Sequence, residues 1–127
     1  MMSDNVLKLI ARVLLAILFV VSGLGKLADP SGVAGLLGSL HLPAPTFLSY
    51  LAGLCEVAGA VAVVAGFRPR AVGLLLAAWC VATALVVHLQ MPMDLMKNLG
   101  LAGGFLLLAT TGAGSLAAGR EGQPVAN

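Results

Sequence analysis

Residues 47–66 form an apolar stretch that carries a single carboxylate, Glu56, near its centre. At ~1.5 Å per residue, a helix of this length crosses the ~30 Å hydrocarbon core of a bilayer. Glu56 would then lie about 13 Å from one face, where an isolated charge costs several kcal/mol or more. Glu56 must therefore be neutral, paired with a cation, or exposed to a polar cavity inside the protein. A protonated carboxyl that only bonds a neighbouring helix is the structural alternative to a functional role.

The composition places the whole chain in a membrane. Of the 127 residues, 60% are hydrophobic and only 9% are charged, and the mean hydropathy is +1.05. A chain of this length holds about four spans with short loops and leaves no room for a separate soluble domain. Its charged residues are too sparse for a nucleic-acid surface. We therefore expect an all-α integral membrane protein, with residues 1–127 as a single domain and no nucleic-acid partner.

Four apolar segments predict a bundle of four transmembrane helices, at about residues 6–24, 47–66, 71–89 and 98–116. The first has the basic flank and small residues of a signal peptide, but we expect it to be retained as a span. Between the first two, Asp29 and Pro30 predict the start of a short amphipathic helix that lies at the membrane interface or plugs the bundle. Residues 117–127 have too little apolar content to be buried, and we expect them to be disordered.

The basic residues are unequally divided between the two sides that this order of spans creates. On the side of the termini lie Lys8, Arg12, Arg68, Arg70 and Arg120, and on the other side lie Lys26 and Lys97. Cytoplasmic loops carry the excess of Lys and Arg in membrane proteins. We therefore expect both termini in the cytoplasm.

Polar side chains are predicted to meet inside the bundle. The predicted depths of Arg12 and Glu56 differ by ~7 Å, about the reach of an extended arginine, so we expect a structural ion pair between them. The alternative is that Arg12 extends to the phosphates of the cytoplasmic leaflet. Above Glu56, four residues fall near the outer mouth of the bundle: Lys26, His88, Lys97 and Asn98. Together these side chains predict a polar funnel that opens outward.

His88 titrates near neutrality and can transfer a proton or bond a carbonyl, although an interfacial histidine is as often a simple hydrogen-bonding group at a helix end. Met91, Met93 and Met96 follow it, and thioethers beside an imidazole suit Cu(I). Methionines at a membrane interface are more often apolar anchors, so we expect no metal site, and copper binding stays an alternative. The sequence has no phosphate loop and no zinc spacing. Redox chemistry would therefore need a diffusible cofactor or a partner.

Four short motifs occur in order along the chain. They comprise Arg12, Leu15, Ala16, Phe19, Ser22, Gly23 and Lys26, then Glu56, Gly59 and Ala60, then His88, and finally Lys97, Asn98, Gly100, Gly103 and Gly104. This pattern, between residues 9 and 115, resembles the bacterial DoxX family. Members often carry Ser-Leu-Asp at the end of the last span, where this chain has Ala117 in place of the acid.

The resemblance implies a four-helix protein of the bacterial inner membrane that is tied to sulfur or oxidative-stress metabolism. The family is similar to the DoxD subunit of archaeal thiosulfate:quinone oxidoreductase, so we expect a quinone-linked oxidoreductase subunit that works with a redox partner. In that role Glu56 and His88 would be the catalytic acid–base residues, while Lys26, Lys97 and Asn98 would bind the quinone. The alternative, from another functional class, is a non-catalytic membrane scaffold or small-solute carrier that assembles soluble partners.

Overall fold

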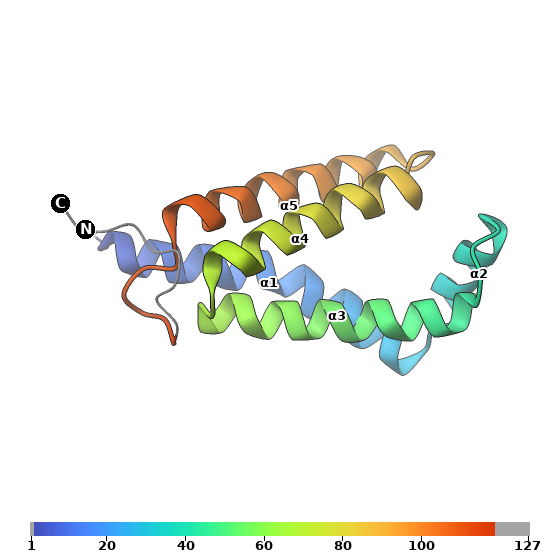
Figure 1. Ribbon diagram of the computed structural model, residues 1–127, viewed down its shortest axis with the longest axis horizontal. Coiled ribbons are helices and arrows are strands. Elements are labelled where there is room, and N and C mark those ends of the chain that lie inside the picture. Colours follow the sequence, from blue (N-terminus) through green and yellow to red (C-terminus); the bar gives the residue numbers. More distant parts are fainter. Residues whose placement is uncertain (1, 119–127) are drawn as a thin grey trace.

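The computed structural model describes residues 2–118, and these residues form five α-helices and no strand. The helices are α1 (Asp4–Ala28), α2 (Ser31–Ser39), α3 (Pro45–Ala65), α4 (Pro69–Val86) and α5 (Pro92–Thr111). Figure 1 shows that the four long helices run side by side along the molecule, while α2 lies at one end. The predicted all-α class is confirmed.

Local sequence signals explain where the helices begin and end. Ser3 caps α1 by accepting a hydrogen bond from the backbone N–H of Val6 (3.3 Å). A proline opens each of α3, α4 and α5, where its fixed φ fits the first turn and its missing N–H costs nothing. Gly66 ends α3 with a φ of 72°, which a residue with a Cβ rarely adopts.

The helix boundaries differ from the predicted spans in ways that matter for the site. α1 continues to Ala28 and therefore places Lys26 in its last turn. α4 stops at Val86, so His88 lies in the connection to α5 rather than at a helix end. α5 ends at Thr111 instead of residue 116, because Gly112 and Gly114 have positive φ values of 77° and 82° and turn the chain back toward α1.

The four long helices form two tightly packed pairs. α1 packs along α3, and α4 packs along α5 (Figure 1). Small residues allow both close approaches, since a Cβ on Gly23 would lie 2.8 Å from the carbonyl oxygen of Gly53, and a Cβ on Gly73 would lie 2.7 Å from that of Phe105. The two pairs are joined through a buried core in which the rings of Phe19 and Phe105 lie 5.4 Å apart between centroids.

Three helices, α1, α3 and α4, are long and apolar enough to cross a membrane. α5, with 20 residues, is longer than α4 with its 18 but carries Asp94, Lys97 and Asn98 in its first two turns. Large apolar side chains are exposed on the outer surfaces of the long helices, as the lipid-facing side of a membrane protein requires. Residues 119–127 lie outside the described part of the chain. They include Arg120 and most of the tail that the sequence predicts to be disordered.

Candidate functional site

A cavity of about 390 Å³ lies between the two helix pairs, at the end of the molecule where α2 is found. Its wall is mostly apolar and includes leucines from α1, α2 and α3. The polar residues that line it are Ser22, Lys26, Glu56, Thr83, His88, Lys97 and Asn98. The structure therefore brings all five residues predicted for the polar funnel to one cavity: Lys26, Glu56, His88, Lys97 and Asn98.

The α1–α3 wall of the cavity carries a buried ion pair. Lys26 Nζ lies 2.9 Å from Glu56 Oε2 and 3.2 Å from Oε1, and only 6% of Glu56 is exposed. Lys26 also donates a hydrogen bond to Ser22 Oγ (2.5 Å), one helical turn earlier in α1. The crossing of Gly23 over Gly53 brings the two helices close enough for this contact. Glu56 is thus satisfied by a cation, as its depth in the apolar stretch requires.

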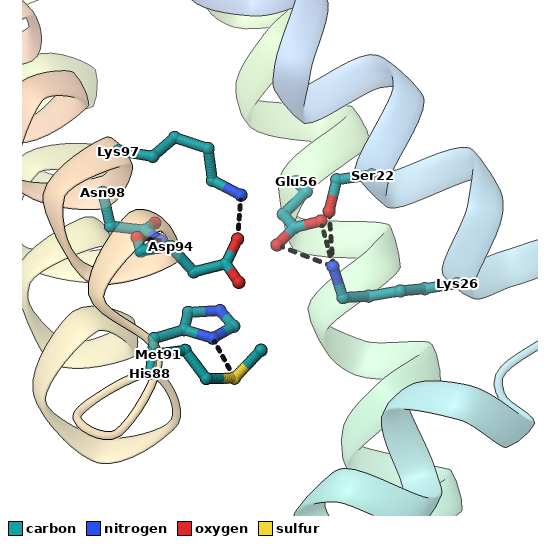
Figure 2. A network of polar contacts seen from close by, with 8 residues as sticks. All are labelled: Ser22, Lys26, Glu56, His88, Met91, Asp94, Lys97 and Asn98. Carbon is teal, nitrogen blue, oxygen red and sulfur yellow. Dashed lines mark hydrogen bonds and ion pairs between the residues drawn. The ribbon is translucent and has the colours of Figure 1, made fainter.

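The opposite wall comes from the α4–α5 connection and the first turns of α5. Lys97 Nζ lies 2.7 Å from Asp94 Oδ1, and the side-chain amide of Asn98 donates a hydrogen bond to the carbonyl oxygen of Asp94 (2.9 Å). His88 Nδ1 lies 3.4 Å from the sulfur of Met91. Figure 2 shows these groups facing the Ser22–Lys26–Glu56 group across the gap between the helix pairs.

The surroundings of His88 favour its neutral form. Burial lowers the pKa of its imidazole below the ordinary value of 6.5, and the charges of Lys97 and Lys26 lower it further. The charge of Asp94 raises the pKa of His88, but this effect is smaller than that of burial. A neutral imidazole has one donor nitrogen and one acceptor nitrogen, so His88 suits a ligand that needs either.

The predicted ion pair between Arg12 and Glu56 is wrong. The Arg12 side chain is 1% exposed and donates hydrogen bonds to the carbonyl oxygens of Val63 (3.5 Å), Val64 (2.8 Å) and Leu116. The last carbonyls of a helix have no partner within that helix, so the end of α3 offers acceptors much closer to Arg12 than the carboxylate. The alternative, that Arg12 extends to lipid phosphates, does not fit its buried position either.

Sequence analysis also missed part of the site. Lys26 was placed at the outer mouth and not beside Glu56, although Ser22 and Lys26 have the i,i+4 spacing that puts both on one face of α1. Trp79 and Thr83 of α4, one turn apart, line the cavity as well. Their apolar context gave no sign of this, because the face that α4 turns toward the cavity depends on its packing with α5.

The metal question stays a prediction. Met93 and Met96 are 75% and 57% exposed, whereas the sulfur of Met91 lies 3.4 Å from Nδ1 of His88. Between residues 2 and 118, no three side chains from His, Cys, Asp and Glu are close enough together to hold a metal ion. Cys55 and Cys80 are both free thiols, one exposed and one buried.

Comparisons with known proteins identify relatives over most of the chain. It is 35% identical over 117 residues to the inner membrane protein YqjF of Escherichia coli, a match that covers 88% of each chain. It is 32% identical over 126 residues to the inner membrane protein YphA of the same organism, with 91% of this chain and 90% of YphA covered.

A third relative has a name that describes an activity. The protein named "Putative oxidoreductase CatD" of Bacillus subtilis is 34% identical over 84 residues, which are 66% of this chain and 61% of CatD. A search of solved structures gave no significant match. The sequence model of the DoxX family matches residues 7–89, which hold most of α1 and all of α2, α3 and α4. The chain therefore belongs to the DoxX family.

Proposed function

We propose that the protein is the membrane subunit of a quinone-linked oxidoreductase and that the cavity between its helix pairs binds the quinone headgroup. The observation that carries this proposal is the composition of the cavity wall. An apolar chamber within the membrane has a buried Lys26–Glu56 pair on one side and His88 with Asn98 on the other. A pocket with mostly apolar walls and a few convergent polar groups is the usual form of a small-molecule site.

The chemistry of the cavity fits a quinone. Its volume of about 390 Å³ is within the range of about 300–1,000 Å³ that small-molecule sites show. Quinone carbonyls accept hydrogen bonds, and the lining supplies donors in the amide of Asn98 and the imidazole of His88. Lys26 already donates to Glu56 and Ser22, so its part would be to keep Glu56 in position beside the quinone. An isoprenoid tail would be solvated by the same apolar layer that surrounds the helices.

A bound quinone would take up two electrons and two protons and leave as the quinol. The residues of this chain would relay these two protons from water, because the paired Glu56 carboxylate and the neutral imidazole of His88 each accept a proton before they pass it to the quinone. Glu56 and His88 are the titratable groups on opposite walls, and Lys26 holds the Glu56 carboxylate in place. The electrons would come from a redox partner, because the described residues offer no cysteine pair and no cluster of metal ligands.

Three relatives support the activity and the location. The name of CatD describes an oxidoreductase, and YqjF and YphA are named as inner membrane proteins. We infer the bacterial inner membrane as the location of this protein, and sulfur or oxidative-stress metabolism as its context. Both inferences rest on family membership together with the apolar surface of the helices.

The arrangement of the helix ends supports four spans. Lys8 Nζ donates to the carbonyl oxygen of Thr111 (3.3 Å), and the backbone N–H of Ser115 donates to Asn5 Oδ1 (2.9 Å), so the start of α1 and the end of α5 lie together. If α1, α3 and α4 cross the bilayer, α5 must cross it as well to return Thr111 to Lys8. We therefore propose α5 as a fourth span, α2 as an interfacial helix and both termini in the cytoplasm.

The topology is tested with reporters fused after Asn127 and within the 87–91 connection. A fluorescent protein that folds only in the cytoplasm should be active at the first site, and alkaline phosphatase, which needs an oxidising compartment, should be active at the second. The opposite result at either site would contradict the proposed orientation.

The function is tested by reconstituting the purified protein with a short-chain quinone and the membrane fraction of the native host. Trp79 is the only tryptophan and lines the cavity, so quinone binding should quench its fluorescence. His88→Ala and Glu56→Gln should lower the rate of quinone reduction by about 10²-fold or more, as expected for loss of acid–base catalysis. Matched controls are His41→Ala and Asp4→Asn, at positions that do not line the cavity. Unchanged rates in both cavity variants would refute the redox proposal.

A small-solute carrier is the second candidate, and one observation favours it. Most contacts between the long helices lie within the α1–α3 and α4–α5 pairs, so the two pairs could move relative to each other around the cavity. A scaffold that assembles soluble partners would need no ligand at all. Binding of a quinone without any change in its reduction rate would support the carrier, and a stable soluble partner without bound quinone would support the scaffold.

A further inference from the structure

We propose that the cavity selects uncharged ligands and rejects small anions, because the carboxylates of Glu56 and Asp94 already neutralise its two lysines. This inference rests on the proposed function, since it specifies which class of molecule enters the same site. It assigns to Glu56 a role in specificity that is separate from proton transfer. It also means that an anionic reductant would not deliver electrons by entering the cavity.

The first support is the pairing of Lys26. Its ammonium contacts both oxygens of Glu56 at 2.9 and 3.2 Å, and it also bonds Ser22 Oγ. The three donor positions of the ammonium are therefore taken. The side chains of Lys26 and Glu56 are 15% and 8% exposed, so little solvent reaches the pair. An anion would have to displace the carboxylate and leave it in an apolar wall, which costs several kcal/mol.

The second support is the opposite wall. Nζ of Lys97 lies 2.7 Å from Oδ1 of Asp94, which is three residues earlier on the same face of α5. The remaining polar groups there are uncharged, namely the amide of Asn98, the hydroxyl of Thr83 and the imidazole of His88, which burial keeps neutral. Among the lining residues that the structure describes, no lysine thus faces the cavity without a carboxylate partner.

The third support is the balance of costs for the ligand itself. An anion loses its favourable hydration free energy on entering a mostly apolar cavity. A wall whose lysines are already paired with carboxylates gives little attraction to offset this loss. An uncharged ligand with a hydroxyl or carbonyl group loses much less. It can bond Asn98, His88 or the outer face of the Lys26–Glu56 pair without separating the pair. The cavity therefore discriminates by charge more than by size.

Glu56 is the residue that sets this preference. The substitution Glu56→Gln keeps the shape of the side chain and leaves Lys26 with an uncompensated positive charge in the cavity wall. That charge would attract an anion across a few ångströms of low-dielectric space. Asp94→Asn would do the same to Lys97, but less strongly, because the side chain of Lys97 is 43% exposed and is screened by solvent.

The test uses two ring compounds of nearly the same shape. 4-Hydroxybenzyl alcohol is uncharged at pH 7, whereas 4-hydroxybenzoate is an anion. Binding of each is measured by the fluorescence of Trp79 in detergent-solubilised protein. The wild-type protein should bind the alcohol at least about tenfold more tightly than the benzoate, since one uncompensated desolvation is worth more than ~1.4 kcal/mol.

The variants then shift the preference toward the anion. Glu56→Gln should bind 4-hydroxybenzoate about tenfold or more tighter than wild type, Asp94→Asn should show a smaller gain, and Asp4→Asn, at the far end of α1, should show none. If Glu56→Gln does not fold, the wild-type ratio and Asp94→Asn still decide the question. Equal affinity of wild type for the two probes, or binding of neither, overturns the proposal.

The result also separates this inference from the proposed function. If the alcohol is preferred but a short-chain quinone is neither bound nor reduced, the quinone proposal fails and charge selection stands. If the quinone is bound and reduced but the benzoate binds as well as the alcohol, charge selection fails and the quinone proposal stands.

Discussion

The two ends of α1 each bury a basic side chain, and they satisfy it in different ways. Arg12 and Lys26 lie about 20 Å apart along the helix. Arg12 bonds backbone carbonyls at the end of α3 and at Leu116, while Lys26 bonds the side chain of Glu56 and faces a cavity. We call the Arg12 end the closed end, because the chain's own carbonyls bind its basic group, and the Lys26 end the open end, because the Lys26–Glu56 pair faces several other polar side chains across a cavity. A second cavity of about 400 Å³ borders Arg12, but among the described residues the only other polar ones that line it are Lys8 and Thr111.

The difference lies in what each partner can do. Backbone carbonyls cannot take up or release protons, and the arginine fork joins several of them at once, so the Arg12 end is a fixed crosslink between α1, α3 and residues 112–118. A carboxylate can be protonated, and its lysine can exchange partners. The structure therefore suggests that the same kind of residue serves stability at one end and chemistry at the other.

The largest effect is expected at the closed end. Arg12→Met would remove the buried guanidinium and with it the donor to the partly buried carbonyls of Val64 and Leu116, so we expect the free energy of unfolding to fall by about 3–5 kcal/mol. The measurement is unfolding by SDS in mixed micelles. The control, Lys8→Met, removes an exposed bond to Thr111 and should cost less than about 1 kcal/mol. A loss as small as in the control would show that Arg12 is not a crosslink.

The second prediction separates the two basic residues by double-mutant cycles with Glu56. In this cycle, the effects of Lys26→Met and Glu56→Gln on the free energy of unfolding should show a coupling energy of about 1–3 kcal/mol. The reason is that the two side chains are in contact and largely buried. The effects of Arg12→Met and Glu56→Gln on the free energy of unfolding should be additive to within about 0.5 kcal/mol, since the two side chains share no partner. Coupling of Arg12 with Glu56 would restore the ion pair that was predicted from the sequence and would contradict the structure.

Sequence analysis predicted the membrane class, the long helices and the set of polar residues around the cavity. These follow from composition and from the position of charges near the ends of apolar segments, as with Lys26, His88 and Lys97. It failed on the partner of Glu56, because the depth estimate compared Arg12 only with other side chains. Free backbone acceptors at a helix end leave no signal in the sequence. Gly66 marks the end of α3 in the sequence, but only the structure shows that a Cβ at this position would collide with the guanidinium of Arg12.

The third prediction concerns the close contact between Gly23 of α1 and Gly53 of α3, beside the Lys26–Glu56 pair. A Cβ on Gly23 would lie 2.8 Å from the carbonyl oxygen of Gly53, so Gly23→Ala should push α1 from α3 and cost about 1–3 kcal/mol. The control lies in the same helix. Gly25 has nothing within 4 Å of the position of a Cβ, and Gly25→Ala should be neutral or stabilising by up to about 1 kcal/mol. Equal effects of the two substitutions would mean that the helices do not cross at Gly23.

The smallest effect is the pH dependence that His88 gives to the open end. Burial lowers the pKa of its imidazole in the folded protein, while the unfolded chain keeps the ordinary value of 6.5. The unfolded state therefore binds a proton first as the pH falls. The contribution of His88 is fully present above pH 6.5 and is lost as the pH falls through the lower folded pKa.

Three charged side chains modulate this titration, namely Asp94, which raises the pKa, and Lys97 and Lys26, which lower it. The measurement is the difference in unfolding free energy between wild type and His88→Gln as a function of pH. The difference should decrease from pH 7 toward pH 5. Asp94→Asn removes the one carboxylate that favours the imidazolium, so it should move the decrease to lower pH. A decrease that stays in place or moves to higher pH would contradict this prediction, because the loss of Asp94 and an uncompensated Lys97 both disfavour the imidazolium.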